Sequence, residues 1–86
     1  MVVVSRQTLC DSHADKVVCA PVNTRPDGRS TEVGVGTVEG LKHESVVNCD
    51  QLLLVQKSAL THYVGALSPR QLLALRTALR IALGVD

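Results

Sequence analysis

Aromatic side chains are almost absent from this chain of 86 residues. It has no tryptophan and no phenylalanine, and Tyr63 is its one tyrosine, although 45% of its residues are hydrophobic. The core must therefore be built from valine, leucine, isoleucine and alanine. A surface that binds single-stranded nucleic acid by stacking successive bases needs several exposed rings, so the composition argues against that mode of binding.

The chain also lacks a charge bias, a disulfide pattern and a long apolar run. Its formal net charge is +1 and 20% of its residues are charged, which excludes an acidic or basic tail and argues against strong nonspecific nucleic-acid binding. Three cysteines without a Cys-x-x-Cys pair are typical of a reduced protein. The apolar runs fall far short of the roughly 18 residues of a membrane span. We therefore expect one cytoplasmic domain over residues 1–86.

Short apolar runs separated by turn residues cover most of residues 1–67. Residues 26–28, Pro-Asp-Gly, predict a tight turn, because proline presets φ and glycine accepts a positive φ. The expected strands are 2–5, 16–22, 31–36, 45–49, 52–55 and 62–65. Their spacing predicts a small, strongly curved β-sheet or barrel over residues 1–67.

Residues 68–84 predict a C-terminal helix. Ser68, Pro69 and Gln71 form a capping-box start with proline in the first helical position, and Gly84 can end the helix in the left-handed conformation. The apolar arc expected to face the core comprises Leu72, Leu75, Leu79, Ala82 and Leu83. The polar sector comprises Arg70, Arg76, Thr77 and Arg80, and Leu73 interrupts it. The fold class is therefore mainly β with a C-terminal α-helix.

Metal and thiol chemistry have little support. Cys10 and His13 have ligand-like spacing, and Cys19 and His43 could add to them, but a structural zinc site normally shows two close pairs. Cys19 and Cys49 lie inside apolar strands, where a thiolate nucleophile is disfavoured. We predict no metal site and interpret these cysteines as small core residues.

Polar residues follow two of the expected strands. Asn23, Thr24 and Arg25 close the strand 16–22, and Asn48, Asp50 and Gln51 close the strand 45–49. If both strands end on one rim, these groups, together with Arg29, could hold a phosphodiester, align a ribose 2′-hydroxyl and move protons. The alternative is that Asn23 and Asp50 end their strands by bonding their own backbone. The residues alone leave both readings open.

Four segments in order carry a resemblance to a known family. They are residues 2–6 (Val-Val-Val-Ser-Arg), 17–24 (Val-Val-Cys-Ala-Pro-Val-Asn-Thr), 39–51 (Glu-Gly-Leu-Lys-His-Glu-Ser-Val-Val-Asn-Cys-Asp-Gln) and 64–84, which begins Val-Gly-Ala-Leu-Ser-Pro. In these segments, which span almost the whole chain, the sequence resembles the MazF/PemK/Kid family of toxins from type II toxin–antitoxin systems. The last two segments are the specific ones.

The resemblance implies an SH3-like barrel of the CcdB/MazF type with a C-terminal helix, assembled as a homodimer. It also implies an mRNA interferase, which is an endoribonuclease that cleaves single-stranded RNA without a metal or other cofactor. In such enzymes a 2′-hydroxyl attacks the adjacent phosphate. The implied partners are single-stranded RNA, a cognate antitoxin and, through the toxin–antitoxin complex, operator DNA.

The resemblance carries over to individual positions. Asn23 falls where the family has a threonine or serine, with Thr24 next to it, and Asp50 matches the aspartate of the family's Asp-Gln pair. Asn48 lies where some members carry a functional arginine. The predicted catalytic residues are Asn23, Thr24 and Asp50, and the predicted RNA-binding residues are Arg25, Arg29 and Asn48.

The sequence departs from the family pattern at its front. Members begin with a strand, a long loop and an Arg-Pro pair before the Val-Val-Val-Ser run, whereas this chain begins at Met1; the first strand and a catalytic arginine are therefore expected to be missing. Two hypotheses follow: a toxin with weak or no activity in this chain, or a non-catalytic module that binds an antitoxin and, with it, operator DNA. A gyrase poison of the CcdB type is disfavoured, because the tail Leu-Gly-Val-Asp lacks aromatic residues.

Overall fold

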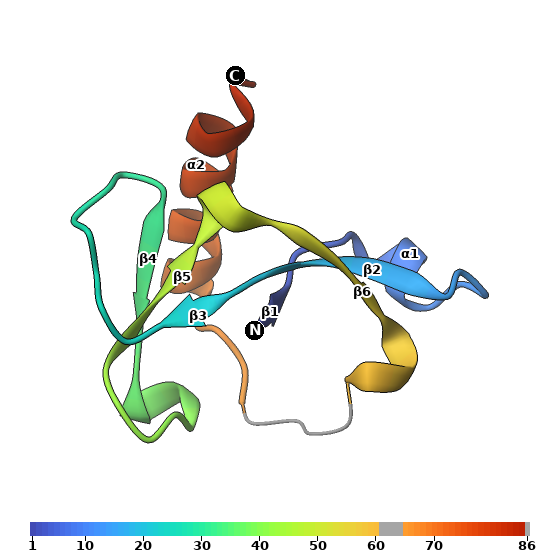
Figure 1. Ribbon diagram of the computed structural model, residues 1–86, viewed down its shortest axis with the longest axis horizontal. Helices are drawn as coiled ribbons and strands as arrows, with labels where there is room; N and C mark the ends of the chain where they lie inside the picture. Colours follow the sequence, from blue (N-terminus) through green and yellow to red (C-terminus); the bar gives the residue numbers. More distant parts are fainter. Residues whose placement is uncertain (61–64, 86) are drawn as a thin grey trace.

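The computed structural model describes residues 1–60 and 65–85, and it is mainly β with a long C-terminal helix, as predicted (Figure 1). The strands are β1 (Val2–Val3), β2 (Lys16–Ala20), β3 (Val22–Asn23), β4 (Glu32–Val35), β5 (Ser45–Asn48) and β6 (Leu53–Gln56). The α-helices are α1 (Gln7–Cys10) and α2 (Pro69–Leu83), and 3₁₀ turns lie at η1 (Thr37–Glu39), η2 (Cys49–Gln51) and η3 (Lys57–Ala59). Residues 62–64 of the sixth predicted strand lie outside the described residues.

The strands form two antiparallel sheets, ordered β1-β2-β6 and β3-β5-β4. Pro21 divides the predicted strand 16–22 between them, because proline has no N–H to donate to a ladder. The turn η2 does the same between β5 and β6. The chain therefore passes twice from one sheet to the other, which produces the curvature that the short strands predict. Among residues 1–60 and 65–85, no strand pair closes the two sheets into a continuous barrel.

Helix α2 begins and ends as predicted. The Ser68 hydroxyl accepts a bond from the Gln71 N–H at 3.2 Å, and Gln71 Oε1 accepts one from the Ser68 N–H at 2.9 Å. Gly84 follows the helix with φ +67°, a conformation that favours glycine. None of the helices in the described ranges has the length and apolar character that a bilayer crossing requires.

The core lies between α2 and the sheet β3-β5-β4. Its buried members are Ala20, Val33, Val35, Val47, Cys49, Leu75 and Ala78. Cys19 and Cys49 are buried, as predicted, and burial raises the pKa of both thiols. The predicted apolar arc of α2 was partly wrong: Leu72 and Leu83 are 44% and 60% exposed, whereas Ala78 is buried. The buried face of the helix is thus rotated from the predicted arc toward Ala78. We attribute this rotation to the small side chain of Ala78, which lets the helix lie close to its neighbours.

Candidate functional site

Strand β5 separates the predicted site residues into two groups. Its register places Val46 opposite Asn23 and Asn48 opposite Glu32. Because β3 runs antiparallel to β5, the end of β3 lies beside the start of β5, while Asp50 follows its end. The condition that both strands end on one rim is therefore not met in the structure. Figure 1 shows the loop of residues 24–31 running from one end of β5 to the other.

The polar side chains at the end of β5 bond one another. Asp50 Oδ2 accepts the hydroxyl of Thr31 at 2.6 Å and lies 3.6 Å from Arg29 Nη1. Asn48 Oδ1 accepts the N–H of Asp50 at 2.9 Å and so caps η2. We call this set the Asp50 cluster, consisting of Arg29, Thr31, Asn48 and Asp50.

The Asp50 cluster ties the start of β4 to the end of β5. Thr31 and Asn48 are buried, and the Thr31 carbonyl accepts the Cys49 N–H at 3.0 Å. The Arg29–Asp50 ion pair is looser, since its side chains are 60% and 33% exposed, and exposed pairs contribute little. The hydroxyl–carboxylate bond is therefore the stronger link, and the loop carrying Arg29 is held mainly through Thr31.

The carboxylate of Glu32 fixes the backbone of the same loop. It accepts the N–H of Asp27 at 3.0 Å and the N–H of Arg29 at 3.1 Å, and Gly28, at φ +74°, lets the chain curl round it. These bonds, that of Asp27 first, hold the pKa of Glu32 below its ordinary value. The sequence analysis missed this role, although an acidic residue four positions after a Pro-Asp-Gly turn is a visible signal.

The polar side chains beside the start of β5, unlike those at its end, do not bond one another. Asn23 is half-buried at the end of β3, and Thr24 and Arg25 are exposed. In the described chain, none of these three side chains has a hydrogen-bond or ion-pair partner. We call them the open group, consisting of Asn23, Thr24 and Arg25.

His43 lies in the connection just before β5, and so at the same end as the open group. Its side chain is exposed. The sequence analysis weighed it only as a metal ligand, because linear distance hides its nearness to Asn23; the β3–β5 register reveals it.

The open group offers chemistry suited to a phosphodiester. A guanidinium binds anionic phosphate oxygens, and a hydroxyl and an amide can bond ribose or base oxygens. Within the described ranges there is no group of three or more His, Cys, Asp or Glu side chains that could hold a metal ion. In the Asp50 cluster, by contrast, the Thr31 hydroxyl, one carboxylate oxygen of Asp50 and the amide oxygen of Asn48 already have partners.

Comparisons with known proteins identify relatives of this chain. Residues 1–83 match the family described as PemK-like, MazF-like toxin of type II toxin–antitoxin system. Endoribonuclease MazF3 of Mycobacterium tuberculosis is 36% identical over 74 residues, which cover 86% of this chain and 72% of that protein.

Solved structures agree with the sequence match. The Mycobacterium tuberculosis toxin MazF-mt6 superimposes with a TM-score of 0.92 at 33% identity, over 99% of this chain and 85% of that one. An endoribonuclease in complex with its cognate antitoxin, from a mycobacterial species, superimposes with a TM-score of 0.86 at 28% identity, over 98% of this chain and 79% of that one. With the family match over nearly its whole length and the same fold as these toxins, this chain belongs to the PemK/MazF-like toxins of type II toxin–antitoxin systems.

Proposed function

We propose that this chain is a cytoplasmic endoribonuclease that cleaves single-stranded RNA by attack of a 2′-hydroxyl, without a metal ion or other cofactor. The observation that carries the proposal is the open group beside the start of β5, whose three side chains have no hydrogen-bond or ion-pair partner among residues 1–60 and 65–85. The name of the 36% identical relative, an endoribonuclease, supports the same reaction class.

The reaction requires a bond exchange at phosphorus. The ribose 2′-oxygen loses its proton and bonds to the adjacent phosphorus, and the bond from phosphorus to the 5′-oxygen of the next nucleotide breaks. That oxygen takes up a proton, so the products end in a 2′,3′-cyclic phosphate and a 5′-hydroxyl. Charge builds up on the phosphate oxygens in the transition state, where a guanidinium is most effective.

In this proposal, the open group contacts the scissile phosphodiester. Arg25 stabilises the charged phosphate, Thr24 and Asn23 orient the 2′-hydroxyl, and the exposed imidazole of His43 accepts its proton. Asn23 pairs with Val46, whereas Asp50 lies four positions further along the chain, in the turn η2 that follows the other end of β5. We therefore assign Arg29 and Asp50 to a neighbouring part of the same RNA strand, and we assign Asn48, which is buried and caps η2, to holding Asp50 in position there.

The test is cleavage of a long, mixed-sequence RNA in the presence of EDTA, with the new 5′ ends mapped. We expect cleavage whose 5′ ends carry hydroxyls and are ligated only after phosphorylation. Arg25→Ala should lower the rate about 100-fold, the size of effect seen when one transition-state donor is removed. Arg70→Ala on α2 is the matched control and should leave the rate unchanged. No cleavage at any protein concentration would overturn the proposal.

A second candidate function is a non-catalytic module that binds an antitoxin and, with it, operator DNA. It is favoured by the solved relative that is in complex with its cognate antitoxin. An antitoxin partner is part of both candidates. A gel shift of operator DNA that needs both proteins, combined with silence in the cleavage assay, would select this function.

We also propose a homodimer. Strand β6 has one partner strand in the described sheet, β2, and exposes Leu53 and Leu54, which are 39% and 62% accessible. Edge strands with apolar side chains favour pairing with another chain. Sedimentation should give the mass of two chains, and Leu54→Lys should shift the distribution toward one.

A further inference from the structure

Asp50 keeps one of its two carboxylate oxygens free. Its Oδ2 atom accepts the Thr31 hydroxyl at 2.6 Å and lies 3.6 Å from Arg29 Nη1. No hydrogen bond or ion pair among residues 1–60 and 65–85 reaches its Oδ1 atom. The side chain of Asp50 is 33% exposed, so a ligand in solution can approach it. The Oδ1 atom is therefore an acceptor that the protein itself leaves unused.

The neighbours of Asp50 fix the position of this acceptor. Thr31 is buried and bonds the carboxylate, and the side chain of Asn48 accepts the backbone N–H of Asp50 at 2.9 Å. The Glu32 carboxylate holds the loop that carries Arg29, through the Arg29 N–H at 3.1 Å. A group whose conformation is already held loses little conformational entropy when a ligand binds. The Asp50 side chain is thus preorganised to accept one hydrogen bond.

A carboxylate beside RNA distinguishes the bases by their donors, because it accepts hydrogen bonds and donates none. Cytosine and adenine each present an exocyclic amine beside an unprotonated ring nitrogen, whereas uracil presents a carbonyl oxygen in place of the amine. Guanine presents two adjacent N–H donors, which suit two free carboxylate oxygens, but Thr31 already bonds Oδ2. One free carboxylate oxygen therefore suits cytosine and adenine best.

We propose that Asp50 is a specificity residue, which selects cytosine or adenine at one position of the RNA by accepting the exocyclic amine at Oδ1. Arg29 contacts the phosphate of that nucleotide and offsets the repulsion between the carboxylate and the RNA backbone. Thr31 is a positioning residue, because its hydroxyl holds the carboxylate through Oδ2. The inference rests on the proposed RNA cleavage and adds the class of base that the substrate carries.

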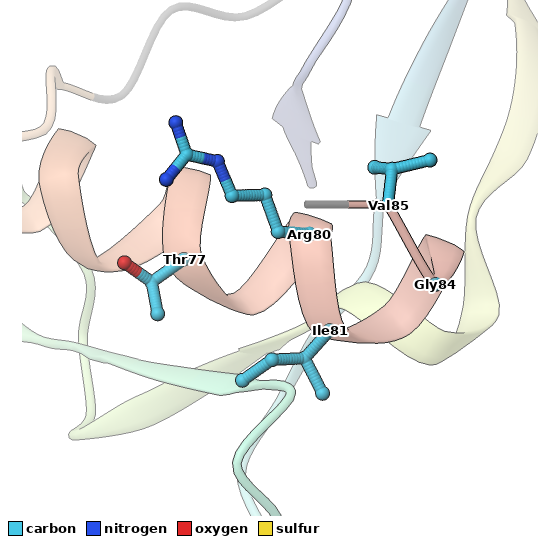
Figure 2. Close-up of a pocket in the computed structure, with 5 residues that line it drawn as sticks. All are labelled: Thr77, Arg80, Ile81, Gly84 and Val85. Carbon is cyan, nitrogen blue, oxygen red and sulfur yellow. The ribbon is translucent and has the colours of Figure 1, made fainter.

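The open groove at the C-terminal end of α2 lacks an acceptor of this kind. Figure 2 shows the residues that line it, which are Thr77, Arg80, Ile81, Gly84 and Val85. Their side chains supply one guanidinium, one hydroxyl and aliphatic surface, and the hydroxyl already donates to the Leu73 carbonyl at 3.2 Å. None of the five carries a carboxylate, so an exocyclic amine gains no anionic acceptor in this groove. We therefore assign base selection to Asp50.

The test is binding of fluorescein-labelled single strands, followed by anisotropy. Homopolymers of about 12 nucleotides match the lengths that single-strand-binding surfaces cover. Each strand carries 2′-O-methyl groups, which prevent attack by the 2′-oxygen, so the measurement does not depend on cleavage. The unaltered protein should bind oligocytidylate about tenfold more tightly than oligouridylate, which is near the lower end of the discrimination that one good base contact provides. Oligoadenylate should also bind more tightly than oligouridylate.

The variant Asp50→Asn should abolish this preference. It keeps the shape of the side chain and an oxygen that can accept the Thr31 hydroxyl, but its new amide N–H₂ can donate to a uracil carbonyl. Asp27→Asn is the matched control, because Asp27 is an exposed residue of the same loop and the substitution removes the same charge. This control should keep the preference. Thermal unfolding should show that both variants are folded at the temperature of the assay.

A change in the RNA tests the same contact without a protein variant. A strand of pyrimidin-2-one nucleotides differs from oligocytidylate only by lacking the exocyclic amine. The unaltered protein should bind this strand as weakly as it binds oligouridylate.

Three results would overturn the inference and leave the proposed cleavage standing. They are equal affinity for oligocytidylate and oligouridylate, a preference that survives Asp50→Asn, and a pyrimidin-2-one strand that binds as tightly as oligocytidylate. Absence of binding to every strand would also overturn the inference. Silence in the cleavage assay as well would overturn the proposed function with it.

Discussion

The start and the end of β5 present polar side chains of similar kinds in opposite conditions. At the end, four side chains of the Asp50 cluster bond one another and the neighbouring backbone, and two of them are buried. At the start, the open group borders the solvent without a partner in the described chain. Buried polar groups need partners to avoid a desolvation cost, whereas exposed, unengaged groups remain available to a ligand. The difference predicts that side chains at the end of β5 contribute more to stability, and that those at its start contribute more to the proposed catalysis.

Removing a hydroxyl from the open group should have the largest effect. We expect Thr24→Val to lower RNA cleavage about 100-fold, because the side chain that orients the attacking 2′-hydroxyl is lost, while the free energy of unfolding stays within about 0.5 kcal/mol. Thr77→Val on α2 is the control and should cleave normally. If Thr24→Val destabilised the fold and kept full activity, the start of β5 would serve stability and not catalysis.

Replacing an asparagine by alanine at each end of β5 compares their contributions to stability directly. Asn48→Ala should cost about 1–2 kcal/mol of unfolding free energy, because the side chain is buried and caps η2. Asn23→Ala should cost less than about 0.5 kcal/mol. Urea denaturation of the two variants measures both. Equal costs would show that Asn23 is also engaged.

A double-mutant cycle isolates the central bond of the Asp50 cluster. Thr31→Val and Asp50→Asn should each destabilise the protein, with a coupling energy of about 1 kcal/mol for the hydroxyl–carboxylate bond. The value is kept low because Asp50 is 33% exposed. Additive effects in chemical denaturation would mean that the bond contributes nothing in solution.

Arg29 should contribute little to stability, although it belongs to the Asp50 cluster. Arg29→Ala should change the unfolding free energy by less than about 0.5 kcal/mol, because its ion pair is exposed. If Arg29 binds RNA, the plot of log affinity against log salt concentration should be less steep for Arg29→Ala, by the amount that corresponds to about one phosphate contact. A cost as large as that of Thr31→Val would show that the ion pair, and not the hydroxyl bond, holds the loop.

The smallest effect concerns Glu32 and depends on pH. The pKa of Glu32 is lowered in the folded protein, so the ionised carboxylate stabilises the fold above the ordinary glutamate pKa, and this contribution is lost as the pH falls through the lowered value. Thermal unfolding of Glu32→Gln should therefore differ from that of the unaltered protein near neutral pH and converge with it in acid. A difference that persists unchanged in acid would contradict the role of charge.

The sequence predicted those features that depend on neighbouring residues. The capping box at Ser68, the glycine at the end of α2 and the positive φ of Gly28 all depend on local backbone chemistry, and all appear in the structure. The buried cysteines follow from apolar strands that must fill a core without aromatic residues.

Features set by contacts distant in sequence were not predictable in the same way. The separation of the open group from the Asp50 cluster depends on the antiparallel register of β3 with β5. That register is fixed by packing and not by the residues at the strand ends. The rotation of α2 toward Ala78 likewise depends on what the helix packs against. The family resemblance supplied the fold and the candidate residues but not their grouping.

The bond from the Asn48 N–H to the Pro21 carbonyl, 2.9 Å long, has a consequence for how the protein unfolds. It joins the two places where the chain passes between the sheets, so neither passage can act as a hinge on its own. Separating the sheets requires breaking this bond and exposing the core beneath it. The backbone N–H of Asn48 is therefore expected to exchange its hydrogen with solvent only when the whole molecule unfolds. The two sheets are expected to unfold together, as one cooperative unit.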